Sequence, residues 1–203
     1  MKLYYKAGAC SLASHIALHE TGVSFEIEAV DTAVGTTASG ADYRKINPKG
    51  YVPALALDDG AVLTENPAVL QFIADRRPEA KLAPEARTFD RARLNEALNW
   101  TSSELHKAFS PLFDAAASDA MREDARTAVA RKFDLIEAQL SDGREWLVAG
   151  EFSVADAYLF TVANWANFTG IDLARWPRLA AFVSRVATRP AAQKALRAEG
   201  LVQ

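Results

Sequence analysis

The stretch that decides the fold is residues 2–20, KLYYKAGACSLASHIALHE, which contains the only cysteine of the chain. Lys2–Tyr5 predicts a short strand, and the segment that begins at Ser11 predicts a helix. The small residues between them predict a loop that puts Cys10 at the start of that helix. A thiol at a helix N-terminus faces unpaired backbone N–H groups and the positive end of the helix dipole, which favour thiolate over thiol. Cys10 is therefore either a reactive thiol or, as is common for a lone cysteine, a buried and inert small hydrophobe.

Composition limits the classes of protein to which the chain can belong. Its 203 residues suffice for one large domain or two small ones, and half of them are hydrophobic. The net charge of -3 gives no electrostatic footprint for nucleic acid or an anionic membrane. A single cysteine excludes an internal disulfide and suits a reducing compartment, and no stretch approaches the roughly 20 apolar residues of a membrane span. We expect a soluble cytoplasmic protein with neither a nucleic acid nor a membrane as its partner.

Strand and helix signals alternate through the first eighty residues. Phe25–Val30 alternates apolar and polar side chains, as a half-buried strand does. Val52–Leu57 and Ala61–Leu63 flank the turn signal Asp58–Gly60, so they predict an antiparallel hairpin. Pro67 then suits the first turn of a helix, where a missing N–H is tolerated. The predicted order is βαβ followed by ββα.

After a linker that contains prolines, the sequence shows only helix signals. Apolar residues at helical spacing predict long amphipathic helices over Arg87–Phe109 and Met121–Leu140. Ser153 with Asp156 three residues later predicts a capping box at the start of another helix. We therefore predict an α/β domain over residues 1–78, a linker over 79–85 and an all-helical domain over 86–203.

The βαβ-ββα order, with a cysteine at the first helix start and a proline opening the third strand, resembles a thioredoxin-like domain. Together with the added helical domain, it resembles the glutathione transferases. Several segments are similar in sequence and order to the bacterial beta class of that family: Met1–Tyr5 with Gly8–Leu12, Asn47–Gly50 before Val52–Pro53, Leu63–Glu65, Ser103–Lys107 before Phe109–Phe113, Ser153–Phe160 and Ala195–Leu201.

The resemblance implies a homodimeric detoxification enzyme that conjugates glutathione, its co-substrate, to hydrophobic electrophilic small molecules without a metal. Its thioredoxin-like domain would bind glutathione, and its helical domain would supply the electrophile pocket and the dimer contacts. Cys10 has no second cysteine in a Cys-x-x-Cys pair, so a redox or peroxidase activity would follow a monothiol route. A different class stays open, a non-enzymatic protein that sequesters apolar ligands. The sequence leaves the natural electrophile open.

In the first domain the resemblance implies a glutathione site formed by Cys10, Ser11, Val52, Pro53, Glu65 and Asn66. The Val52–Pro53 bond is expected to be cis, and the Val52 backbone would pair with the cysteinyl part of glutathione like an added strand. The helix N-terminus at Glu65 and Asn66 suits the γ-glutamyl carboxylate, and Glu65 can hold the neighbouring ammonium.

The chain departs from its relatives at two of these positions. Asn66 replaces a serine that many glutathione transferases carry, but its backbone N–H is retained. Gly35 stands where relatives commonly present a lysine to the glycine carboxylate of glutathione. Lys45 or Lys49 is open as a substitute.

In the helical domain the resemblance implies that His106 and Lys107 act with Cys10 in catalysis. His106 would hydrogen-bond the sulfur of glutathione or shuttle a proton, and Lys107 would add positive charge that favours thiolate. Asn99, Ser103 and Glu104 on the same helix would approach glutathione, in part from the neighbouring subunit. Without the resemblance, a helix His followed by Lys is typical of a solvated surface pair.

Two further sets of side chains are candidates for binding. The wall of the electrophile pocket would come from five aromatic residues, each of which is by itself typical of a core: Tyr5, Phe109, Phe113, Trp165 and Phe168. His15 and His19 have the i, i+4 spacing of a metal site. No third ligand accompanies them, so we expect a packed or solvated pair and no metal.

Overall fold

The structure is a computed structural model that describes all 203 residues. Its contacts divide the chain into two compact units, each described here by itself. Unit 1 comprises Met1–Ala83 and Thr188–Gln203, and unit 2 comprises Pro84–Ala187. The predicted fold class is confirmed, because unit 1 carries a five-stranded sheet with helices and unit 2 is entirely helical. The division differs from the predicted one in that the C-terminal segment belongs to the α/β unit.

Unit 1 follows the predicted βαβ-ββα order, with a short extra strand and two single 3-10 turns. Its elements are β1 (Lys2–Tyr5), α1 (Ser11–Thr21), β2 (Glu26–Asp31), β3 (Thr36–Thr37), η1 (Tyr43–Lys45), β4 (Ala54–Ala56), β5 (Val62–Thr64), α2 (Asn66–Arg76), η2 (Pro78–Ala80) and α10 (Pro190–Ala198). The strands are ordered β3-β2-β1-β4-β5. β1 and β2 are parallel, and the predicted β4–β5 hairpin is antiparallel with Leu55 opposite Leu63.

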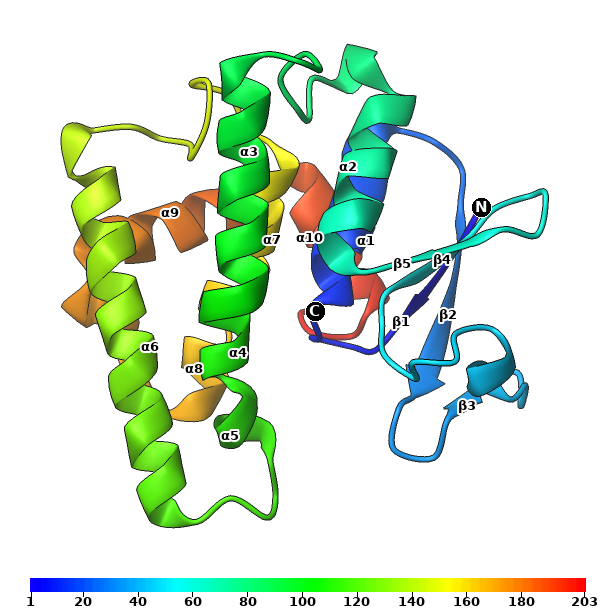
Figure 1. Ribbon diagram of the computed structural model, residues 1–203, viewed down its shortest axis with the longest axis horizontal. Helices are drawn as coiled ribbons and strands as arrows, with labels where there is room; N and C mark the ends of the chain where they lie inside the picture. Colours follow the sequence, from blue (N-terminus) through cyan, green and yellow to red (C-terminus); the bar gives the residue numbers. More distant parts are fainter. The chain divides into compact units, whose positions relative to one another are not determined.

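The two faces of the sheet are covered by different parts of the chain. Adjacent residues of a strand point to opposite faces, so Leu3 and Tyr4 of β1 enter different cores. Tyr4 packs with Val30, Tyr43 and Ala54, which brings the turn η1 onto its face of the sheet. Helices α1 and α2 pack against each other on the other face (Figure 1). This arrangement leaves the start of α1, with Cys10, at the end of β1.

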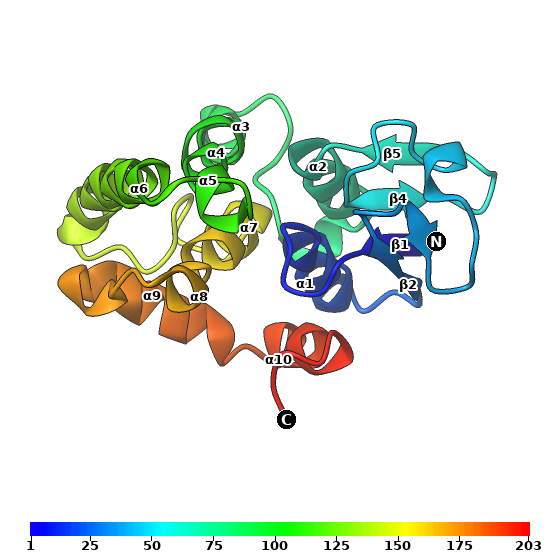
Figure 2. The same ribbon diagram turned by 90° about the horizontal axis from the view of Figure 1, so that it is seen from below.

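Helix α10 joins unit 1 because it packs along α1, as Figure 2 shows. Its buried face is alanine and leucine, formed by Ala191, Ala192, Ala195 and Leu196. At its N-terminal end the Arg189 Nε lies 2.6 Å from the Glu20 Oε1. The predicted division followed sequence continuity, which cannot reveal that a helix returns to the first unit.

Unit 2 is a helical bundle with one helix at its centre. Its elements are α3 (Phe89–Trp100), η3 (Thr101–Leu105), α4 (His106–Ala108), α5 (Ser110–Phe113), α6 (Asp119–Gln139), η4 (Leu140–Asp142), α7 (Val154–Ala163), α8 (Ala166–Thr169), η5 (Leu173–Arg175) and α9 (Pro177–Ala187). All ten residues of α7 are buried. The predicted helix over Met121–Leu140 corresponds to α6, which starts two residues earlier behind the N-cap Ser118.

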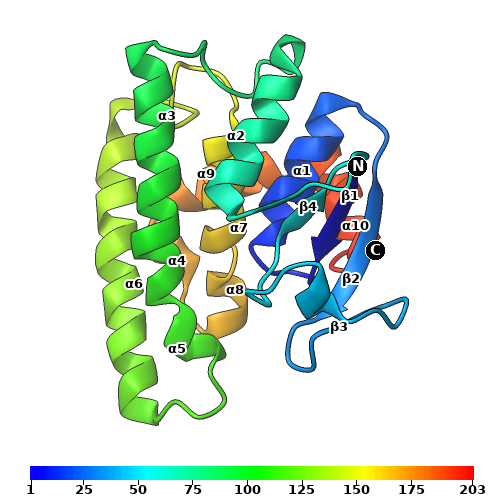
Figure 3. The same ribbon diagram turned by 45° about the vertical axis from the view of Figure 1, so that its right-hand side comes forward.

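The predicted helix over Arg87–Phe109 is interrupted. Between α3 and α4 the turn η3 is a π-helix, in which hydrogen bonds span five residues instead of four. The segment nevertheless keeps one line from α3 into α4 (Figure 3). Such turns are frequent at functional sites, and this one contains Ser103 and Glu104 and ends directly before His106.

The predicted capping box at the start of α7 is confirmed. The Ser153 N–H and hydroxyl both donate to Asp156 Oδ2, at 2.8 and 2.7 Å, and the Leu147 N–H donates to Oδ1 at 2.8 Å. The carboxylate thus ties the preceding loop to the central helix of unit 2. No helix of the structure combines the length and the apolar character that crossing a bilayer requires.

Candidate functional site

Cys10 lies directly before α1, at the end of a loop held by its own hydrogen bonds. The Lys6 N–H donates to the Ser11 hydroxyl oxygen at 3.2 Å, and the Ala9 N–H donates to the Lys6 carbonyl at 3.0 Å. Cys10 is buried, with 9% of its surface exposed. Its Sγ lies 3.3 Å from the Val52 carbonyl oxygen, to which the thiol donates. The fold therefore brings together two of the residues predicted to bind glutathione, Cys10 and Val52.

The backbone at Val52 is fixed from both sides. The Val52–Pro53 peptide bond is cis, as expected, and Pro53 leads into β4. Just before Val52, the Tyr51 carbonyl accepts hydrogen bonds from the Tyr43 hydroxyl at 2.8 Å and from the Asn47 side-chain amide at 2.7 Å. A peptide segment held in this way can present its hydrogen-bonding groups to an extended ligand without first becoming ordered.

Asn66 connects the start of α2 to the start of α1. It is buried, and its side-chain amide donates to the Cys10 carbonyl at 2.9 Å. Its Oδ1 accepts from the Ser14 hydroxyl at 2.6 Å. The side chain is therefore occupied by α1, and only the backbone N–H of Asn66 is available for an anion at the N-terminus of α2.

Glu65 is exposed and has an uncommon backbone conformation. Its φ is +70° and its ψ is 112°. L-residues seldom adopt this backbone conformation, which costs of the order of 1–3 kcal/mol. Such strain concentrates at binding sites. The Lys49 Nζ lies 2.6 Å from the Glu65 Oε1 and 3.1 Å from the Thr64 hydroxyl oxygen. Lys49, one of the two lysines considered for the glycine carboxylate, is thus engaged at Glu65.

Position 35 has a different basic neighbour. Gly35 is buried with φ +76°, and a Cβ added there would lie 3.4 Å from the Arg44 Nε. The Arg44 side chain therefore lies over Gly35, and Arg44 is an exposed residue. Lys45, the other lysine considered, is also exposed. Arg44 was not predicted, because its proximity to Gly35 depends on how η1 folds back onto the sheet.

In unit 2, His106 lies in an aromatic environment directly after the π turn. Its Nδ1 is 2.9 Å from the Tyr158 hydroxyl of α7. Its ring meets the Trp165 ring edge to face, with centroids 4.8 Å apart. Burial, with a smaller contribution from the adjacent Lys107, lowers the pKa of His106 to about 4. The imidazole is therefore neutral at pH 7, and Tyr158, which the sequence analysis did not single out, fixes its orientation.

The other polar residues predicted on this helix are exposed. Asn99, Ser103, Glu104 and Lys107 all face solvent within unit 2. The Ser103 hydroxyl donates to the Asn99 carbonyl at 2.9 Å, which contributes to the helix rather than to a ligand. The Glu104 Oε2 lies 2.6 Å from the Lys132 Nζ of α6.

Three of the five predicted pocket aromatics form one cluster with His106. The ring centroids of Phe109 and Phe113 lie 5.6 and 5.2 Å from that of Trp165. Phe109 is completely buried and supports the cluster, whereas Phe113 is 55% exposed and can meet a ligand. Phe168 is 70% exposed, and Tyr5 belongs to unit 1, with its ring centroid 5.9 Å from that of His15.

The His15–His19 pair is packed. Its rings are stacked with centroids 5.0 Å apart, and the His15 Nδ1 lies 2.9 Å from the Glu199 Oε1. Burial, and then the neighbouring His15, lowers the pKa of His19 to about 4. No group of three or more ligating side chains is placed to hold a metal ion.

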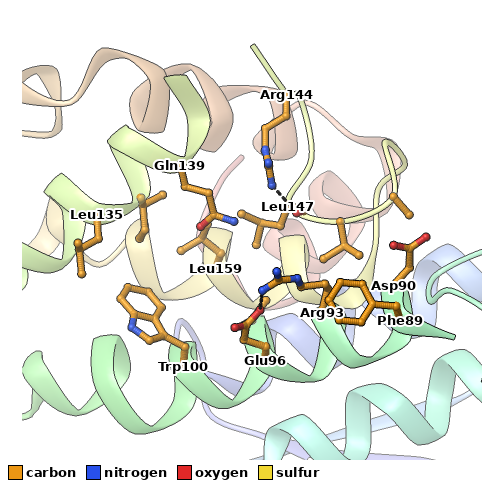
Figure 4. A pocket seen from close by; sticks show the side chains of 14 residues that line it. Phe89, Asp90, Arg93, Glu96, Trp100, Leu135, Gln139, Arg144, Leu147 and Leu159 are labelled. Atoms are coloured by element: carbon orange, nitrogen blue, oxygen red, sulfur yellow. Dashed lines mark hydrogen bonds and ion pairs between the residues drawn. The ribbon is translucent and has the colours of Figure 1, made fainter. Parts of the chain in front are cut away.

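A cavity of about 630 Å³ opens in unit 2 away from these residues (Figure 4). It lies between α3, α6 and the loop at residues 144–149, and none of the predicted site residues lines it. Figure 4 shows Trp100 and Leu135 at the left of the cavity and Leu147 and Leu159 towards the middle of the view. The cavity therefore belongs to a different surface from the His106 cluster.

Comparison with known proteins identifies the family. Residues 7–76 match the family model of the glutathione S-transferase N-terminal domain, and residues 100–190 match that of the C-terminal domain. The chain is 43% identical over 201 residues to Glutathione S-transferase GstA of Escherichia coli O157:H7, which covers 99% of this chain and all of the relative.

Solved structures agree over the whole length. The bacterial beta-class glutathione S-transferase of Sphingomonas chungbukensis is 48% identical, with a TM-score of 0.97 and complete coverage of both chains. A sphingomonad glutathione S-transferase complexed with glutathione is also 48% identical, with a TM-score of 0.96 and complete coverage of both chains. These matches confirm the resemblance found in the sequence, and the chain belongs to the glutathione S-transferase family, alongside its bacterial beta-class members.

Proposed function

We propose that this protein joins glutathione to hydrophobic electrophilic small molecules in the cytoplasm. The observation that carries the proposal is the position of the Cys10 thiol, at the start of α1 and 3.3 Å from the Val52 carbonyl. The N-terminus of α2 is linked to the same place by the Asn66–Cys10 hydrogen bond of 2.9 Å. A thiol group, a fixed backbone segment and a helix N-terminus together match the thiol, peptide and carboxylate of glutathione.

In this proposal the cysteinyl part of glutathione lies along Val52, with its sulfur beside Cys10 and Ser11. The γ-glutamyl carboxylate meets the N–H groups at the start of α2, and the Glu65 carboxylate holds the γ-glutamyl ammonium, with Lys49 moving aside. Arg44 supplies the positive charge for the glycine carboxylate. The position of the exposed residue Arg44 over Gly35 supports this role, because an arginine can bind a carboxylate through two parallel N–H groups.

The reaction is a substitution at the electrophilic carbon. The thiolate of bound glutathione forms a carbon–sulfur bond, and a halide or comparable leaving group departs with the electron pair of the broken bond. Binding both reactants together supplies proximity. Lys107 adds positive charge that favours the thiolate, and the exposed Phe113 forms part of the pocket wall.

We assign His106 the role of hydrogen-bond donor to the sulfur rather than that of proton acceptor. A group whose pKa is about 4 is a poor base at neutral pH. If the Tyr158 hydroxyl donates to Nδ1 across their 2.9 Å contact, the ring proton lies on Nε2 and can be donated to a thiolate. The hydrogen bond then strengthens as negative charge concentrates on sulfur.

Labelling with oxidised glutathione tests the glutathione site directly. The Cys10 thiolate attacks one sulfur of the disulfide, forms a mixed disulfide, and releases the second glutathione as a thiolate that takes up a proton. Intact-mass measurement should show one glutathione adduct on the wild type and none on Cys10→Ala. An unmodified wild type would refute this monothiol chemistry. Loss of conjugation in Cys10→Ala and His106→Ala would separate an enzyme from a sequestering protein.

We further propose that the working unit is a homodimer that pairs through α3 and α6. Phe89 and Leu135 border the 630 Å³ cavity between these helices and are 72% and 61% exposed. Large apolar side chains around a hollow are typical of a surface that a partner covers. In the dimer, Asn99, Ser103 and Glu104 would approach the γ-glutamyl end of the glutathione held by the second subunit.

Glu104→Ala tests the contribution of the partner subunit. We expect it to raise the KM for glutathione more than the KM for the electrophile. Lys132→Ala is the matched control, because it breaks the same 2.6 Å ion pair and keeps the Glu104 carboxylate. Light scattering at micromolar concentration measures the assembly, and a monomer with full activity would contradict the proposal.

A further inference from the structure

The side chain of Glu199 is fully buried although it follows the last helix of the chain. The segment turns sharply after α10 through Gly200, which has φ +70°, and the Glu199 side chain is 0% exposed. Each carboxylate oxygen has its own partner. Oε2 accepts a hydrogen bond from the Gly8 N–H at 2.9 Å, and Oε1 lies 2.9 Å from the His15 Nδ1.

These two partners bracket Cys10 in the sequence. Gly8 lies in the loop that leads to Cys10, and His15 lies in the helix that Cys10 begins. Gly8 has φ +71°, and a Cβ added there would lie 3.5 Å from the Leu201 Cδ2, so the end of the chain also packs on this loop. One carboxylate from the C-terminal segment therefore holds the polypeptide on both sides of the reactive position.

A purely structural role does not account for a carboxylate at this place. Burying a carboxylate is unfavourable unless its partners are well placed, and apolar side chains of similar volume often stabilise as well or better. Helix α10 is already attached to α1 by its alanine and leucine face and by the Arg189–Glu20 ion pair of 2.6 Å. A carboxylate differs from an apolar side chain in that its two oxygens bind a backbone N–H and an imidazole at the same time and fix the orientation of both.

We propose that Glu199 is a positioning residue for Cys10. It holds Gly8 and His15, and through them it fixes the loop at residues 6–9 and the first turns of α1, so that the thiol keeps its place 3.3 Å from the Val52 carbonyl. This inference rests on the proposed function, because it assigns the placement of Cys10 to the binding of glutathione. The C-terminal segment thereby becomes part of the glutathione site without touching the ligand.

The test compares Glu199→Gln and Glu199→Ala with Glu20→Gln. The control breaks a different polar attachment, the ion pair between Glu20 of α1 and Arg189 at the start of α10, and keeps the Glu199 carboxylate that accepts from the Gly8 N–H. Hydrogen exchange of a peptide spanning residues 6–10 reports the loop, and steady-state kinetics report the KM for glutathione and for a chloro-nitroaromatic. In the Glu199 variants we expect at least tenfold faster exchange and at least a fivefold higher KM for glutathione, with the electrophile KM unchanged. We expect neither effect in Glu20→Gln.

The possible failures are distinguishable. If the wild type has no activity with glutathione, the proposed function fails, whatever the variants do. If the wild type is active and the Glu199 variants have faster exchange but an unchanged KM for glutathione, Glu199 only stabilises the fold and the inference is overturned. Equal effects in Glu20→Gln would also overturn it, because they would come from a general loosening of α10. If Glu199→Ala does not fold, Glu199→Gln keeps the side-chain volume and decides the outcome.

Discussion

Removing the carboxylate that joins α7 to its preceding loop is expected to destabilise the protein strongly. Asp156 is 0% exposed and accepts three hydrogen bonds, two of them from the backbone N–H groups of Leu147 and Ser153. Asp156→Ala leaves both N–H groups buried without a partner. Each unsatisfied group costs about 1–3 kcal/mol, so for the two groups we expect a loss of roughly 2–6 kcal/mol in the free energy of unfolding.

The serine of the capping box contributes less, and its contribution depends on the aspartate. Ser153→Ala should cost about 1 kcal/mol, the usual value of an N-cap side chain. Its hydroxyl donates to Asp156 Oδ2 at 2.7 Å, so the same substitution should cost much less when Asp156 is already alanine. We expect a coupling free energy of about 1 kcal/mol between the two residues.

Denaturant unfolding of the two single variants and the double variant measures these quantities. Burial raises the pKa of Asp156 to about 6, so unfolding is measured at pH 7.5, where the carboxyl is ionised. Protein concentration is held constant because assembly changes apparent stability. Asp172→Ala is the matched control, since Asp172 caps the exposed turn η5 by accepting from the Ala174 N–H at 3.0 Å. A loss below 1 kcal/mol for Asp156→Ala, or purely additive effects in the double variant, would refute this account of the cap.

Three further outcomes are expected. His106→Ala should lower kcat/KM with a chloro-nitroaromatic at least tenfold, a loss of about 1.4 kcal/mol of transition-state stabilisation, and Tyr158→Phe should lower it by a smaller factor; unchanged kinetics in His106→Ala would show that another residue acts on the sulfur. Burial lowers the pKa of His106 to about 4 in the folded protein, whereas its pKa in the unfolded chain is near 6.5. The folded state therefore gains up to about 3 kcal/mol of stability above pH 6.5, and it loses this stability as the pH falls towards 4. Unfolding curves at pH 7 and pH 4.5 should therefore differ more in the wild type than in His106→Phe, and an equal difference would contradict the assignment. Arg44→Ala should raise the KM for glutathione several-fold and Lys45→Ala should not, and the reverse order in steady-state kinetics would assign the glycine carboxylate to Lys45.

Local patterns predicted the elements of unit 1 because local chemistry specifies them. The alternation in Phe25–Val30, the turn at Asp58–Gly60 and the proline at position 67 each act within a few residues, and β2, the β4–β5 hairpin and α2 form where they indicate. Contacts across the chain gave no such signal. Glu199 lies 184 positions from His15, and nothing near either residue indicates that they are partners.

The same distinction explains which site residues could be proposed from the sequence. Cys10 and Asn66 stand at helix starts, where the residue type already indicates a chemical role. Arg44 and Tyr158 reach the positions that support their proposed roles only through folding, Arg44 when η1 returns over Gly35 and Tyr158 when α7 packs beside the turn that precedes His106. Residues that orient or replace a predicted group are therefore found in the structure rather than in the motif.

The π turn before His106 shows how far helical periodicity can be followed. The buried positions Leu94, Leu98, Thr101 and Leu105 fit an uninterrupted α-helix, and the same spacing predicts that Ala108 is buried next. Phe109 is the fully buried residue instead, since the wide turn at Thr101–Leu105 shifts the following residues around the helix axis. An uninterrupted helix that buries Ala108 and a helix with a π turn that buries Phe109 both place an apolar residue in the core, so the sequence cannot distinguish between them. The π turn rotates the helical segment after it about the helix axis. That segment begins with His106, which contacts Tyr158 and Trp165. The π turn at Thr101–Leu105, which the apolar periodicity does not reveal, therefore orients the candidate catalytic histidine.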